Sequence, residues 1–164
     1  MATKLENLIS DIKELLPHPV TDENLDLGVE QVDLGIEELV NELCEGNPLF
    51  NKIPHKGVRL IGGDPSEVVA FVTEEVINFS QFALVWTHPH IPTLKPIPIA
   101  SIQWRNLRKP ERQQIFTTLV ETISKRRRKL YRICQYCERL MPPEWLFSDT
   151  ICHSCAEKHL GVTF

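Results

Sequence analysis

Two cysteine pairs near the C-terminal end of the chain carry the clearest chemistry in the sequence. Cys134 and Cys137 form the first pair, Cys152 and Cys155 form the second, and fourteen residues separate the pairs. A two-residue gap lets one tight turn present two sulfur atoms to the same ion, and zinc takes four thiolates at tetrahedral angles. The spacing therefore predicts one zinc ion held by all four cysteines. Such a shell leaves no position open for water, so we expect a structural rather than a catalytic metal.

Two other uses of C-x-x-C pairs fit the chain less well. A redox pair normally comes singly, after a strand in a βαβ unit, whereas here two pairs follow a long basic helix. Two disulfides would require an oxidising compartment, and the N-terminal segment lacks a signal-peptide pattern. We therefore expect a cytoplasmic location, with the fifth cysteine, Cys44, as a small buried apolar residue.

Residues 134–164 resemble the zinc-ribbon and treble-clef class of zinc fingers. In the treble-clef group a first cysteine knuckle is followed by a hairpin, and the second cysteine pair opens a helix. The stretch from Cys152 to Gly161 is similar to that second half, with Gly161 as the helix stop. The resemblance implies a metal site rather than a particular task. Residues 1–133 resemble no family that we recognise.

Other residues of this C-terminal segment have less specific interpretations. His153 and His159 are spare nitrogen donors, but exposed positions on a finger helix explain them better because the zinc shell is already full. The apolar stretch 140–147 either docks the finger onto the rest of the chain or binds a partner. We favour docking, because so small a finger buries little surface by itself.

Charge is divided unevenly along the chain, although the net charge is only −4. Residues 1–50 carry twelve acidic and two basic side chains, whereas residues 101–133 carry ten basic and two acidic ones. Either the two regions neutralise each other, or the basic region faces an anionic partner such as nucleic acid. The candidate phosphate-binding residues are Lys125, Arg126, Arg127, Arg128, Lys129 and Arg132.

Apolar periodicity predicts an α+β architecture with two parts. Residues 1–133 are expected to form a helix-dominated domain with a small sheet, and residues 134–164 the zinc finger. The expected helices cover residues 3–16, 34–45, 65–79 and 110–132. The third of these rests on Asp64-Pro65-Ser66-Glu67, which has the form of a capping box. Short strands are expected at 58–61, 83–87 and 99–104, and the proline-rich segment 88–98 as an extended surface connection.

No catalytic motif stands out, and no apolar run approaches the roughly 18 residues of a membrane span. His88 and His90 lack a third ligand at a matching spacing, so they make a weak metal site. The sequence favours a non-enzymatic zinc-binding protein that contacts nucleic acid through the basic helix beside the finger. A protein-binding adaptor or regulator, using the acidic helices or the apolar hairpin, remains the alternative.

Overall fold

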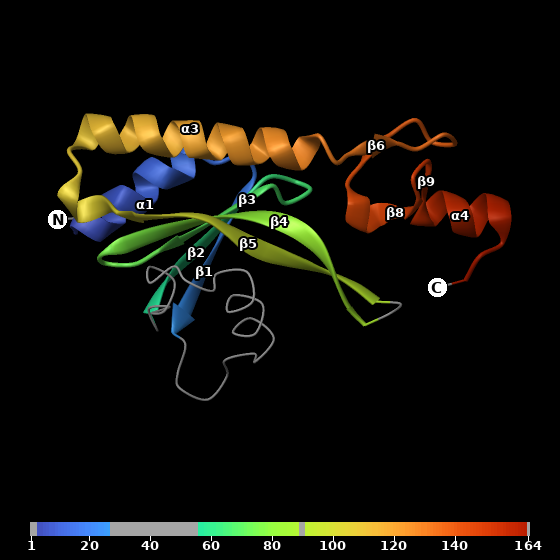
Figure 1. Cartoon of the computed structure of the whole chain (residues 1–164), viewed down its shortest axis with the longest axis horizontal. Coiled ribbons are helices and arrows are strands. Elements are labelled where there is room, and N and C mark those ends of the chain that lie inside the picture. The colour runs from blue at the N-terminus through green and yellow to red at the C-terminus, as the bar shows by residue number, and fades with distance from the viewer. Residues whose placement is uncertain (1–2, 27–55, 89–90, 164) are drawn as a thin grey trace.

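A five-stranded antiparallel sheet forms the main body of the protein (Figure 1). The computed structural model describes residues 3–26, 56–88 and 91–163. The strands lie in the sheet in chain order, each antiparallel to its neighbours. They are β1 (Val20–Asp26), β2 (Lys56–Gly62), β3 (Val68–Val72), β4 (Val76–His88) and β5 (Ile91–Gln103).

Two helices, α1 (Lys4–Leu15) and α3 (Lys109–Arg128), cover one face of this sheet (Figure 1). A capping box between Thr3 and Glu6 starts α1, and apolar side chains of α1 enter the core at helical spacing. On α3, the Phe116 ring packs against Phe79 of β4 with ring centroids 5.4 Å apart. The helices expected at 3–16 and 110–132 are confirmed, although α3 ends at Arg128 and Arg132 belongs to a strand.

The expectation of a helix-dominated domain is wrong, because the sheet dominates the body. The helix expected over 65–79 is instead a turn, β3 and the start of β4. The apparent capping box is not formed: the Glu67 carboxylate accepts a hydrogen bond from Arg128 at 2.8 Å. This segment is rich in β-branched residues, which favour a pleated surface. Alternate residues of β3 enter the core, namely Val68, Ala70 and Val72.

Residues 91–98 of the proline-rich segment are also part of a strand and not a surface connection, since they form most of β5. Because β5 lies at the edge of the sheet, one row of its backbone N–H groups faces away from β4. Pro92, Pro96 and Pro98 share one parity along the strand, so each removes a donor from the same side. Proline on an exposed edge also discourages pairing with a further strand.

The other expected strands coincide with parts of the sheet. The strand expected at 58–61 is confirmed within β2, and the strand expected at 83–87 is confirmed within β4. The strand expected at 99–104 belongs to β5 as far as Gln103. Trp104, at the end of β5, begins a 3-10 turn, η1 (Trp104–Asn106), and is buried. Its indole N–H donates to the Thr73 carbonyl at 3.0 Å. The helix expected at 34–45 lies outside the described residues.

A cysteine-rich finger follows α3 and lies beyond its C-terminal end (Figure 1). The finger consists of β6 (Arg132–Ile133), β7 (Leu140–Met141), the 3-10 turn η2 (Pro143–Trp145), β8 (Leu146–Ser148), β9 (Ile151–Cys152) and α4 (His153–Leu160).

No helix in the described part of the chain is long and apolar enough to cross a membrane.

Candidate metal centre

The four cysteines of the two pairs come together in the finger. Their sulfur atoms all lie within 4.8 Å of one another. A Zn–S bond of about 2.3 Å places tetrahedral sulfur ligands about 3.8 Å apart, and the Cys137 and Cys152 sulfurs are separated by 3.9 Å. All four are free thiols, so the disulfide alternative is not realised. The cluster thus suits a metal ion such as zinc in both donor type and spacing.

The first pair is presented by a tight turn between β6 and β7. Cys134 N–H donates to the Arg139 carbonyl at 3.0 Å, and Glu138 N–H donates to the Cys134 carbonyl at 2.8 Å. Glu138 adopts a left-handed conformation with φ 56°, which is unusual for a residue with a side chain. The Cys137 and Tyr136 N–H groups of this turn, together with the Cys152 N–H of β9, point toward the Cys134 sulfur and lower the pKa of that thiol to about 6.

The second pair is placed by the start of α4. Cys152 is the N-cap residue and Cys155 lies in the first turn, so the start of the helix presents both sulfurs from one short segment. Gly161, with φ 66°, ends the helix as expected from the sequence. Burial raises the pKa of the Cys155 thiol to about 12. A bound zinc ion would supply the positive charge that this buried thiolate lacks.

One cation lies beside the cluster. Arg139 sits next to Cys137, and its backbone N–H helps to lower the pKa of that thiol. The neighbouring Cys137 sulfur in turn raises the pKa of the Arg139 guanidinium. Four thiolates around one Zn²⁺ would carry a net charge of about −2, and Arg139 would partly neutralise it.

Neither histidine of the finger belongs to the cysteine cluster. The His159 ring stacks on Tyr136, with centroids 4.4 Å apart and an interplanar angle of 9°. His153 lines a pocket beside the cluster. Of the other residues considered from the sequence, Cys44 and His90 lie outside the described residues, and His88 ends β4.

The finger is attached to the sheet body through a buried ionic contact that the sequence did not reveal. Arg127 of α3 is fully buried and donates to the Glu144 carboxylate of η2, and also to the Ser66 carbonyl at 3.3 Å. The Tyr131 ring lies 5.4 Å from the same guanidinium carbon. Arg127 and Glu144 are only seventeen residues apart, but no sequence spacing rule links the end of a helix to a turn in another element.

Docking of the apolar hairpin is therefore only partial. Pro142 is buried and η2 contacts β5, as the docking interpretation requires. Met141 is buried too, but against the cysteines of the finger itself. In contrast, large apolar side chains of the finger remain exposed, namely Ile133, Leu140, Trp145 and Phe147. Ile133 and Leu140 are directly paired between β6 and β7, so they share one face of that ladder.

The six basic candidates differ in their surroundings. Arg127 is buried, and Arg128 is paired with the buried Glu67 at 2.8 Å. Arg132 is exposed but folds back, donating to the Lys129 and Tyr131 carbonyls at 2.9 Å. The other three, Lys125, Arg126 and Lys129, are exposed and pair with no acidic side chain of the described residues.

The N-terminal helix does not neutralise these three residues. Its ion pair with α3 joins Asp11 to Lys109, 3.6 Å apart, at the first residue of α3. Lys125 lies sixteen residues further on, which is about 24 Å along a helix.

Comparison with known proteins adds no further assignment: no protein-family model, no curated protein and no solved structure matches the chain.

Proposed function

We propose that Cys134, Cys137, Cys152 and Cys155 hold one structural zinc ion in a treble-clef finger. The order of elements supports this: a cysteine turn, a hairpin from β8 to β9, and a helix whose first turn carries the second pair. Thiolate ligands favour zinc among the common divalent ions, and four of them leave no open position for a substrate. The reduced thiols suit a cytoplasmic location.

We further propose that the protein binds nucleic acid through the basic end of α3 beside the finger. One observation carries this proposal: Lys125, Arg126 and Lys129 form an exposed cationic group that no acidic residue in the described ranges neutralises. Each phosphate neutralised by such a group releases counterions, which favours binding at low salt. The role is a non-catalytic one, in which the zinc fixes the finger against the helix.

The test is the salt dependence of binding to a labelled oligonucleotide by the zinc-loaded full chain. The triple variant Lys125→Gln, Arg126→Gln, Lys129→Gln should bind more weakly and flatten the logarithmic salt slope by about two to three units. Arg127 is left unchanged because it is buried against Glu144. Equal slopes for the wild type and the triple variant would refute the proposal.

A second candidate function is that of a protein-binding adaptor. The exposed side chains of Ile133 and Leu140, which are paired with each other, favour this function. Apolar side chains paired on a solvent-facing ladder are a common feature of protein interaction sites. The adaptor proposal expects no binding to any oligonucleotide at low salt. It also expects that replacing both residues with threonine disrupts a protein complex and leaves zinc content unchanged.

A further inference from the structure

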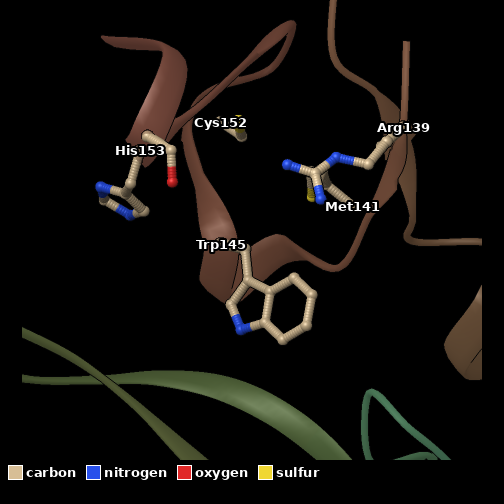
Figure 2. A pocket seen from close by; sticks show the side chains of 6 residues that line it. Arg139, Met141, Trp145, Cys152 and His153 are labelled. Atoms are coloured by element: carbon tan, nitrogen blue, oxygen red, sulfur yellow. The ribbon is translucent and has the colours of Figure 1, made fainter. Parts of the chain in front are cut away.

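A pocket opens on the finger beside the metal centre (Figure 2). Its residues come from four elements of the finger, β7, η2, β9 and the start of α4, and from the turn before β7. They are Arg139, Met141, Trp145, Cys152, His153 and Ser154. The cysteine among them means that the pocket shares one wall with the metal centre.

The side chains around this pocket combine an aromatic face with hydrogen-bond donors. In Figure 2, the Arg139 guanidinium points into the hollow, and the Trp145 indole forms the wall nearest the sheet body. Trp145 is 47% exposed, so docking of η2 onto β5 leaves about half of its surface open to a ligand. An indole face stacks on any nucleobase, and a guanidinium contacts a phosphate or a base edge.

The pocket adjoins the basic end of α3. Glu144, which is next to Trp145 in the chain, accepts the hydrogen bond from Arg127, and Arg127 lies between the exposed Arg126 and the half-exposed Arg128. The cationic group and the pocket therefore lie near the same end of α3, where Arg127 joins the helix to the finger.

We propose that this pocket receives an unpaired base of a single-stranded nucleic acid, stacked on Trp145. The inference rests on the nucleic-acid binding proposed above and names its substrate class. A base inside a duplex has both faces covered by its neighbours, so only an unpaired base can stack on a protein aromatic ring. The basic residues then supply affinity for phosphates, and the pocket selects strands that carry free bases.

The experiment compares two labelled oligomers of equal length and charge, an oligothymidylate and the same backbone without bases. Zinc-loaded full-length protein should bind the oligothymidylate more tightly. Trp145→Ala should weaken that binding about 5- to 100-fold, leave binding to the abasic oligomer unchanged, and leave the salt slope unchanged. Trp145→Phe should retain most of the affinity, because a phenyl ring also stacks.

Phe147→Ala is the matched control. Phe147 is a second exposed aromatic residue of the finger, 42% exposed, but it does not line the pocket. Its replacement should leave the preference for the oligothymidylate intact, and zinc content is measured for every variant to confirm an intact finger.

The outcomes separate this inference from the function on which it rests. If the wild type binds both oligomers equally, or if Trp145→Ala binds the oligothymidylate as tightly as the wild type, the base pocket is refuted. The charge variant of α3 still tests the proposed function in that case. If the wild type binds neither oligomer at low salt, both proposals are refuted.

Discussion

The sheet body and the finger are stabilised by different interactions. In the body, apolar side chains from α1, α3 and the central strands form one buried cluster, and residues such as Ile12, Phe79 and Ile123 are completely buried. Burying one such side chain contributes about 1.5–3 kcal/mol. The buried cluster of the finger contains Cys134, Met141, Cys152 and Cys155. Three of these four are candidate metal ligands, so the finger has almost no core without a metal ion.

The contact between the two regions is of a third kind. It is polar and buried, with Arg127 at its centre and unpartnered polar atoms on Glu67, Tyr131 and Glu144. A buried ion pair adds little net stability compared with an apolar contact, but breaking it by removing one partner is costly. The body, the finger and their junction should therefore respond to different perturbations.

Loss of the metal should have the largest effect, and it should be confined to the finger. Cys155→Ser removes one of the four thiolates, so we expect the finger from β6 to α4 to lose its structure and the zinc content to fall to near zero. Hydrogen exchange should show lost protection in residues 132–160. Protection in β2, β3 and β4 should remain, because their core contains no ligand of the cluster.

Acidification supplies an independent check on the same prediction. Zinc binds thiolates, so its affinity should fall as the pH falls and protons compete for the sulfurs. A body that unfolds together with the finger in either experiment would contradict the proposed independence of its core. Retention of zinc by Cys155→Ser would remove that cysteine from the ligand set.

The junction should give the next largest effect. Glu144→Leu leaves the fully buried Arg127 without its carboxylate partner, and we expect a loss of about 3–5 kcal/mol in unfolding free energy. The double variant Arg127→Met, Glu144→Leu should recover most of this loss, because no uncompensated charge remains. Urea unfolding of the zinc-loaded variants measures both values.

Lys13→Gln provides the control for the junction. Lys13 and Asp22 form an exposed ion pair of 2.8 Å in the body, and its removal should change stability far less than Glu144→Leu. Added salt should weaken the Lys13 pair but not the buried Arg127 pair. Equal losses from the two single variants would mean that Arg127 is not the energetic link between the two regions.

The finger was largely predictable from sequence because its information is local. Two C-x-x-C pairs and Gly161 after an eight-residue helix are short-range patterns, and the structure reproduces both. The charged surface was only partly predictable. Sequence shows that Arg127 is cationic, but not that it is buried, because burial depends on Glu144 and Ser66 from other elements.

The body was predicted less well, since strand formation depends on partners distant in sequence. Asp64 to Glu67 satisfies the local rule for a helix start, yet these residues form a turn and the next five, Val68–Val72, pair with β2. The Glu67 carboxylate accepts a hydrogen bond from Arg128, sixty-one residues away. The prolines of β5 are compatible with a strand only because β5 lies at an edge, and the edge position is not visible in the sequence.

The smallest predicted effect concerns the backbone of the cysteine turn. Glu138 holds a left-handed conformation that costs a residue with a Cβ atom about 1–2 kcal/mol, whereas glycine adopts it without this penalty. Glycine also gains entropy in the unfolded chain, which offsets part of the benefit by about 0.5–1 kcal/mol. We therefore expect Glu138→Gly to stabilise the zinc-bound finger by about 0.5–1 kcal/mol, or about a two- to fivefold gain in zinc affinity.

Glu138→Ala separates this backbone effect from the effect of charge. Both substitutions remove a carboxylate from the residue after Cys137, but only glycine relieves the left-handed strain. Competition with a chromophoric chelator measures zinc affinity for the three proteins. A higher affinity for the glycine variant than for the alanine variant assigns the gain to the backbone. Equal affinities would contradict the predicted net gain, because they would show that the strain at Glu138 is no larger than the entropic cost of glycine in the unfolded chain.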